Sequence, residues 1–214
     1  MKVSALLAHR LAKPLWGLCL LLPFAWLVYG AATDQLGANP AEHLIRSTGS
    51  WALRILCLTL AVTPLRLMLG LPTLARYRRM CGLFVYFYAV LHLVSYSVFD
   101  MGLDVQEMAH DIAKRPFILV GILGWLMLTL LAATSFNRAI KALGAKVWQR
   151  VHRLVYAIAG LAILHLFWVR AAKHNFFSAQ VYAAILFLLL GWRVVHRWMP
   201  VLKMRYLAAR TLKA

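Results

Sequence analysis

The sequence predicts an all-α membrane protein, a polytopic bundle of six transmembrane helices. Of its 214 residues, 63% are hydrophobic and only 14% are charged, whereas about a quarter of a soluble domain is charged. Apolar runs close to the ~20 residues that a helix needs to cross the hydrocarbon recur six times along the chain. Helices rather than strands are expected, because a continuous helix satisfies its own backbone amides in lipid.

The six predicted spans belong to a single domain over residues 1–214. They cover residues 15–32, 51–71, 80–99, 117–135, 150–169 and 179–199. A bend is expected in the second span at Pro64, because proline interrupts helical hydrogen bonding. The first span could instead be a cleaved signal peptide, but a retained helix is preferred, because signal sequences have shorter apolar stretches of roughly 7–15 residues. The polar segment 100–115 is expected to carry a short interfacial helix.

The distribution of charge predicts how the bundle is oriented. Eighteen of the 24 Lys and Arg residues fall on one side of the six spans, and the enrichment of Lys and Arg in cytoplasmic loops therefore places both termini in the cytoplasm. The net charge of +18 is attributed to anchors that face the anionic lipid bilayer, and no nucleic-acid binding is predicted, because the basic clusters flank the spans. All the acidic residues fall in two segments on the opposite side: Asp34, Glu42, Asp100, Asp104, Glu107 and Asp111.

Three histidines fall within or at the edge of predicted spans, where ionisable side chains are costly and indicate function. His92 and His165 lie about 18 Å and 22 Å along their helices, counted from Met80 and Arg150 at 1.5 Å per residue. Both spans start at the cytoplasmic side, so the two imidazoles are expected at a similar height. Two neutral imidazoles on facing helices can bind one haem iron axially. Two packing histidines, hydrogen-bonded to backbone or Ser, are the equally open alternative.

His152, at the cytoplasmic edge of the fifth span, precedes His165 by roughly 20 Å of helix, enough for a second haem level. Two observations count against that second haem. The matching position on the third span is Arg79, which is no ordinary iron ligand. An ideal helix would also place the two histidines of the fifth span about 140° apart. His152 is therefore a candidate for a second haem, or for contact with a propionate, a quinone or a flavin.

Basic residues near both ends of the spans are candidates for binding anions. Arg54 lies inside a span and is the best placed to pair with a haem propionate, although snorkelling to headgroups is the alternative. Arg46, Arg170 and Lys173 share that candidate role on the outer side. On the inner rim an anionic flavin or an acidic redox protein could bind, with lipid anchoring as the alternative, at Arg76, Arg78, Arg79, Arg150 and Arg153.

Short motifs spread along the chain resemble a single family. They are LLPFAWLVYG at 21–30, GANP at 37–40, TPLR at 63–66, RRMCGL at 78–83, LHLVSY at 91–96, KRPFILVGILGW at 114–125, LAATS at 131–135 and LGAKVWQRVHRLVY at 143–156. Together they resemble the haem-binding membrane subunit of bacterial periplasmic methionine sulfoxide reductase systems, the MsrQ/YedZ family. That family belongs to the wider ferric-reductase-like transmembrane proteins.

This resemblance implies a function that spacing alone does not show. It implies a six-helix core in the bacterial inner membrane that holds haem b, with FMN as a further cofactor at no named site. Electrons would pass from the quinone pool, or from a cytosolic flavin reductase, to a periplasmic molybdopterin subunit that reduces methionine sulfoxide in damaged envelope proteins. The family's functional histidines correspond to His92, His152 and His165. One haem is expected from the comparison, and Arg79 leaves a second in doubt.

Two other functions remain open from the sequence. A stand-alone transmembrane ferric or quinol reductase would use the same haem but act directly on a small acceptor. A small transporter would use the intramembrane ionisable groups for ions or protons, but the repeats and broken helices typical of transporters are not evident. No residue resembles a hydrolytic nucleophile, so the chain is predicted to be an electron-transfer subunit rather than a complete enzyme.

Overall fold

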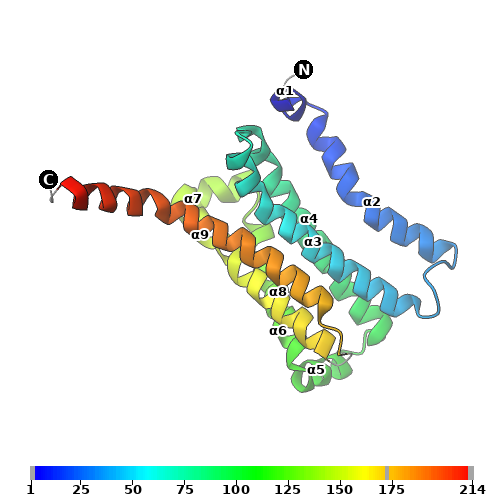
Figure 1. The fold of residues 1–214 in the computed structure, drawn as a ribbon. Helices are drawn as coiled ribbons and strands as arrows, with labels where there is room; N and C mark the ends of the chain where they lie inside the picture. The colour runs from blue at the N-terminus through cyan, green and yellow to red at the C-terminus, as the bar shows by residue number, and fades with distance from the viewer. Residues whose placement is uncertain (1–2, 172–173, 212–214) are drawn as a thin grey trace.

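The structure is a computed structural model that describes residues 3–171 and 174–211, with side chains up to residue 199. Over these residues the chain is helical and contains no strand, as the sequence predicts. The long helices run side by side in one bundle, with the short α5 at one end and α7 toward the other (Figure 1).

The helices follow one another through short connections. A 3-10 turn, η1 (Pro72–Leu74), precedes α4, and a π-helical turn, η2 (Tyr96–Asp100), follows it. The helices are α1 (Val3–Ala8), α2 (Ala12–Ala32), α3 (Pro40–Met68), α4 (Ala75–Ser95), α5 (Val105–Lys114), α6 (Pro116–Ala133), α7 (Asn137–His152), α8 (Leu154–Ala171) and α9 (Phe177–Thr211).

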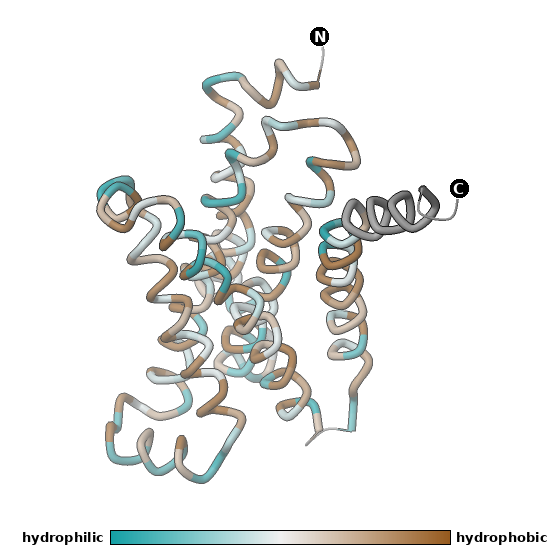
Figure 2. Tube along the Cα trace, turned by 90° about the vertical axis from the view of Figure 1, so that its left-hand side faces the viewer, coloured by the Kyte–Doolittle hydropathy of each residue, from teal (hydrophilic) through white to brown (hydrophobic). Residues whose placement is uncertain are grey.

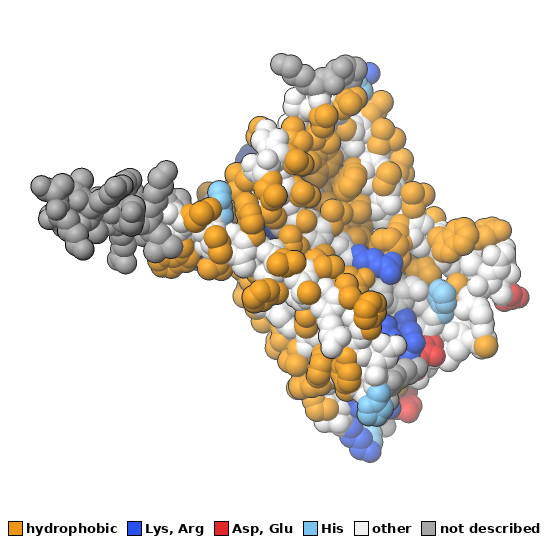
Figure 3. All heavy atoms as spheres, in the orientation of Figure 1, with side chains coloured by type: hydrophobic (Ala, Val, Ile, Leu, Met, Phe, Trp, Pro, Cys, Tyr) orange, Lys and Arg blue, Asp and Glu red, His pale blue; other side chains and the backbone are white. Residues whose placement is uncertain are grey.

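Six stretches of the described chain are long and apolar enough to cross a bilayer, which confirms the predicted six-span bundle. Hydrophobic residues dominate the long helices, and hydrophilic residues gather at turns and helix ends (Figure 2). Hydrophobic side chains also cover most of the face seen in Figure 3, where the few visible acidic side chains lie toward one end. The expected short helix in segment 100–115 is present as α5.

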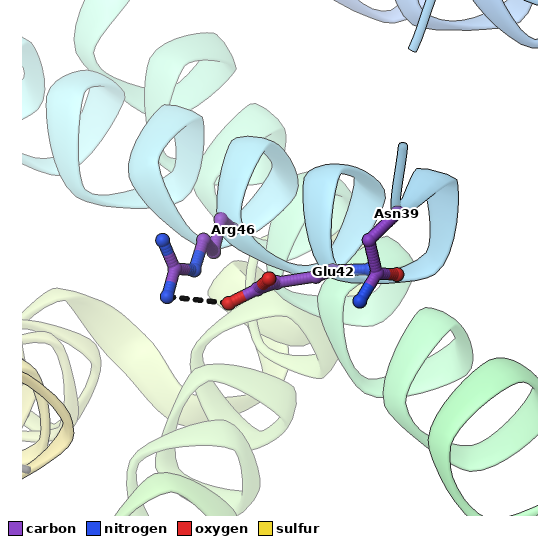
Figure 4. A network of polar contacts seen from close by, with 3 residues as sticks. All are labelled: Asn39, Glu42 and Arg46. Carbon is purple, nitrogen blue, oxygen red and sulfur yellow. Dashed lines mark hydrogen bonds and ion pairs between the residues drawn. The ribbon is translucent and has the colours of Figure 1, made fainter. Parts of the chain in front are cut away.

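The second membrane helix, α3, begins well before the predicted span 51–71, because the polar side chains of its first turns are hydrogen-bonded or ion-paired. The Asn39 side chain accepts a hydrogen bond from the Glu42 amide, and Pro40 occupies the first turn. Glu42 then forms an ion pair with Arg46 one turn later (Figure 4). N-capping and an i,i+4 ion pair each favour helix, so α3 continues outward to Pro40.

The segment before the fifth span is helical rather than a loop. Residues 137–152 form α7, which is interrupted at Gly144, where φ is +71°. The helix ends at His152, and α8 begins at Leu154. His152 and His165 therefore lie on consecutive helices, which are separated only by Arg153.

The buried core lies mainly between α3, α4 and α8, and α2 is attached to it through Tyr88 on α4. The fully buried Tyr88 hydroxyl donates to the Leu20 carbonyl oxygen at 2.8 Å and accepts from the Phe24 amide at 3.1 Å. In a regular helix those two backbone groups would bond each other. The Tyr88 hydroxyl thus lies between two backbone groups of α2 beside Pro23, which has no amide hydrogen to donate to the helix.

Candidate functional site

The structure brings His92 and His165 together at one height of the bundle. His92 lies near the end of α4, and His165 lies near the end of α8. Their ring centroids are 6.1 Å apart, and the ring planes are inclined at 81°. The shared height predicted from residue counts is therefore correct.

The spacing of the two rings suits a metal ion held between them. A metal–imidazole bond of about 2 Å, with roughly 1 Å from nitrogen to ring centre on each side, separates two ligand rings by about 6 Å. The same separation also suits two rings packed edge to face. The hydrogen bonds of the rings show which nitrogen of each imidazole remains available to a metal ion.

Both imidazoles are held by a backbone carbonyl group of a neighbouring helix. The Nδ1–H of His92 donates to the Ile45 carbonyl oxygen on α3 at 2.8 Å. The Nδ1–H of His165 donates to the Phe117 carbonyl oxygen on α6 at 2.7 Å. Because a carbonyl oxygen only accepts, Nδ1 carries the proton, and Nε2 of the neutral ring keeps its lone pair. This is the usual arrangement of a metal-binding histidine.

The donor set fits haem better than a bare metal ion. No group of three or more His, Cys, Asp or Glu side chains placed to hold a metal ion occurs within residues 3–171 and 174–211. A structural zinc ion requires four ligands, whereas a porphyrin supplies four nitrogens of its own and leaves only the axial positions to the protein. The chain has no C-x-x-C-H sequence for covalent attachment of haem, so a haem held without that covalent link fits these residues.

The paired histidines lie toward the end of the bundle that carries α5. Ile45 is near the start of α3 and Phe117 is near the start of α6. The site is therefore formed by the first turns of α3 and α6 and the last turns of α4 and α8. At that end the Tyr96 hydroxyl donates to Asp111 at 2.9 Å, and Asp111 forms an ion pair with Arg115 at 2.9 Å. These contacts fix α5 against the turn that follows α4.

The basic residues considered for haem propionates are placed in different surroundings. Arg54 donates from Nε to the Tyr182 hydroxyl at 3.1 Å, and its guanidinium lies 4.6 Å from the Trp51 ring centre. Its pairing with haem stays a prediction. Arg46 is occupied by Glu42. The Arg170 Nε is buried without a hydrogen-bond partner in the described structure, and Lys173 lies outside the described residues.

His152 has a different environment from the paired histidines. Its ring stacks on Trp148 with centroids 4.0 Å apart, and its Nε2 lies 3.2 Å from the Thr134 hydroxyl oxygen. The matching arginine, Arg79, donates from Nη1 to the Asn137 side-chain oxygen at 2.8 Å. Neither side chain is thus aligned as one of a pair of axial ligands.

His152 and Arg79 both line a large pocket at the end of the bundle away from α5. This pocket, which we call the basic pocket, has a volume of about 900 Å³ and is formed by α3, α4, α6, α7, α8 and α9. Among the residues whose side chains the structure describes, seven Lys and Arg residues line it, including Arg78, Lys146 and Arg150, and no carboxylate does. The aromatic rings of Trp148 and Tyr156 line it as well.

Several elements of both sites were not predicted. The carbonyl groups of Ile45 and Phe117 are backbone groups, so the residue types in the sequence do not indicate that they bind the histidines. Thr134 and Trp148, which hold His152, come from segments predicted to be a span end and a loop. The basic rim was predicted at five arginines, and four of them line the pocket: Arg78, Arg79, Arg150 and Arg153. The fifth, Arg76, instead donates to the Ala8 carbonyl oxygen at 3.0 Å. The enclosure of the rim by α7 was not predicted.

Comparison with known proteins identifies the family. The sequence model described as "Ferric reductase like transmembrane component" matches residues 48–163. A protein from Polaromonas naphthalenivorans named "Protein-methionine-sulfoxide reductase heme-binding subunit MsrQ" is 65% identical over 90% of this chain and 88% of its own length. The chain belongs to the MsrQ family of ferric reductase like transmembrane proteins.

More distant members of the MsrQ family align over most of the chain. The MsrQ protein of Ralstonia nicotianae is 49% identical over 91% of this chain and 88% of its own length. That of Caulobacter vibrioides is 42% identical over 80% of this chain and 81% of its own length. No solved structure matches the chain.

Proposed function

We propose that this chain is a haem b membrane subunit that passes electrons to a periplasmic methionine sulfoxide reductase. The observation that carries the proposal is the pair of imidazoles, His92 and His165, whose Nδ1–H groups bond to carbonyl oxygens and whose ring centres are 6.1 Å apart. The names of the MsrQ relatives, which call them haem-binding subunits of a protein-methionine-sulfoxide reductase, support it.

The chain's own residues bind and orient the cofactor. His92 and His165 would hold the haem iron through Nε2, and the Ile45 and Phe117 carbonyl groups fix the ring orientations. When bound, haem supplies an iron that alternates between ferrous and ferric states. The surrounding apolar helices hold the site away from water and across the membrane.

The charges of the chain support an outward direction for the electrons. All six acidic residues belong to the end of the bundle that carries α5, and the basic pocket lies at the other end. Under the positive-inside rule the α5 end is periplasmic and both termini are cytoplasmic in the bacterial inner membrane. The paired histidines then lie near a periplasmic molybdopterin partner, which uses two electrons and two protons to convert methionine sulfoxide to methionine and water in damaged envelope proteins.

The basic pocket is the site proposed for loading electrons from the inner side. Its seven cations face no carboxylate, so an anionic ligand would provide their counter-charge. FMN carries a phosphate and a flat ring system that suits the Arg and aromatic lining. The quinone pool or a cytosolic flavin reductase is the proposed donor. A second haem at His152 is less favoured, because its Nε2 is engaged by Thr134.

The haem assignment is tested by substituting each paired histidine. His92→Ala and His165→Ala are each expected to lose most of the haem of the purified protein, because one axial ligand is removed. The measurement is a pyridine haemochrome assay normalised to protein. His110→Ala on α5, where the histidine is exposed, is the control and should keep full haem content. Full haem content in both His92→Ala and His165→Ala would refute the assignment.

The choice between a subunit and a stand-alone ferric or quinol reductase rests on the partner. The reduced purified protein, mixed with the periplasmic molybdopterin reductase and methionine sulfoxide, should be reoxidised and form methionine. A stand-alone reductase would instead be reoxidised only by ferric iron or a quinone. A protein without a haem absorption band would favour the transporter.

A further inference from the structure

Two glycines lie directly against the paired histidines. A Cβ atom built on Gly49 of α3 would lie 3.1 Å from both Cε1 and Nδ1 of His92. One built on Gly121 of α6 would lie 3.0 Å from the same two atoms of His165. Ordinary van der Waals contact for a Cβ begins at 3.4 Å, so neither position accepts a side chain without movement of the imidazole.

Each glycine has a fixed relation to the carbonyl group that holds the histidine. Gly49 follows Ile45 by four residues, and Gly121 follows Phe117 by four residues. In an α-helix the amide of residue i+4 donates to the carbonyl oxygen of residue i. The oxygen that accepts the imidazole Nδ1–H is therefore the one that the glycine amide already uses, and its two lone pairs can serve both donors.

This arrangement occurs twice, on two pairs of helices. On α3 and α4 it consists of Ile45, Gly49 and His92; on α6 and α8 it consists of Phe117, Gly121 and His165. In both, the missing Cβ opens the side of the helix through which the imidazole reaches the carbonyl oxygen.

We propose that Gly49 and Gly121 are positioning residues of the histidine pair, each keeping one backbone carbonyl group accessible to the ring that it orients. This inference rests on the proposed haem function for its consequence, but the coupling between glycine and histidine belongs to the protein alone. A hydrogen bond to the outer nitrogen of a ligand imidazole raises the basicity of the ligand. Through this bond the glycines influence the reduction potential of the iron.

General helix packing is the competing explanation, because small residues are common where membrane helices meet. One other helical glycine has a tight contact: a Cβ on Gly30 of α2 would lie 2.8 Å from the end of the Leu36 side chain, which is flexible and is not an imidazole. Three further helical glycines have no tight contact at all. A Cβ on Gly124 would be 4.0 Å from the Leu161 side chain, one on Gly82 would be 4.0 Å from Thr59, and one on Gly160 would meet nothing within 4 Å. The close approach to an imidazole distinguishes Gly49 and Gly121 from these three glycines.

A double-mutant cycle on the protein without haem separates the two explanations. Gly49→Ala should lower the thermal unfolding midpoint of the apoprotein in detergent, because the added methyl group displaces His92. In the His92→Ala background the same glycine substitution should have at most a small effect, since the clashing ring is gone. A glycine that serves packing alone would cost the same in both backgrounds, because the two sites would be independent, and that result would overturn the proposal. The corresponding cycle pairs Gly121→Ala with His165→Ala.

The second measurement uses the haem-loaded protein. Gly121→Ala should raise the midpoint potential and alter the ferric electron paramagnetic resonance signal, because a weakened Nδ1 hydrogen bond makes His165 a poorer electron donor. Gly124→Ala, on the same helix, is the matched control and should leave both unchanged. An unchanged potential and signal in Gly121→Ala would overturn the proposal. Failure of the haem assignment appears separately, as haem retained without the histidines.

Discussion

At the residue scale, the three histidines of the spans differ in which ring nitrogen is engaged. His92 and His165 donate through Nδ1 to carbonyl oxygens, which leaves Nε2 available. His152 is engaged through Nε2 instead, which lies 3.2 Å from the Thr134 hydroxyl oxygen. A side chain fixed through Nε2 and stacked on Trp148 is better placed to contact a bound ligand than to coordinate iron.

Substitution of His152 tests the distinction between the two kinds of histidine. His152→Ala is expected to keep the haem content of the unchanged protein and to lower its flavin content several-fold, because His152 lines the basic pocket and not the paired site. Pyridine haemochrome and fluorescence assays on one sample give both stoichiometries. About two haems in the unchanged protein, falling to about one in His152→Ala, would show that the pocket holds a second haem instead.

At the element scale, α2 depends on one hydroxyl group of α4. The Tyr88 hydroxyl joins the Leu20 carbonyl oxygen and the Phe24 amide at the position where Pro23 already interrupts the ladder. Trp16 Nε1–H also points to the Cys81 sulfur, at 3.4 Å. Since α2 otherwise exposes many large hydrophobic side chains, these polar contacts define its register against the bundle.

Tyr88→Phe is therefore expected to destabilise the protein by about 1 kcal/mol, the usual net value of a buried hydrogen bond, with membrane-protein values extending somewhat lower. The loss should be seen as a lower thermal unfolding midpoint in detergent. Tyr86→Phe on the same helix is the control, because the Tyr86 hydroxyl has no hydrogen bond in the described structure. Equal midpoints for the two variants would contradict the assigned role of Tyr88.

At the scale of the whole molecule, opposite charges are separated along the bundle axis. Both ion pairs in the described part of the chain, Glu42–Arg46 and Asp111–Arg115, lie toward the α5 end. The basic pocket lies at the other end and includes no acidic residue. This separation underlies both the proposed orientation and the proposed inner site for an anionic cofactor.

Labelling of single cysteines tests the orientation. In a variant with Cys19, Cys57 and Cys81 replaced by Ala, Gln106→Cys on α5 should react with a membrane-impermeant maleimide added to spheroplasts. Lys141→Cys on α7 should react only after the membrane is opened. Both positions are exposed in the structure, so access to the reagent depends on the side of the membrane. The reverse pattern would contradict cytoplasmic termini.

The sequence by itself determined the fold class and the six spans, and it predicted that His92 and His165 lie at a similar height. Hydropathy and helix length are local properties, and a fixed rise per residue turns sequence distance into depth. The same reasoning did not predict that α7 ends at His152 and that α8 starts at Leu154.

The tertiary structure alone decided what the paired histidines contact. The carbonyl acceptors at Ile45 and Phe117, the glycines opposite each ring and the hydroxyl of Tyr88 within α2 all depend on which helices are neighbours and in what register. Backbone atoms carry no residue-specific signal, and a glycine in a membrane helix can serve several kinds of packing. Neighbouring helices and their rotation are set by the packing of the whole bundle, which no single segment encodes.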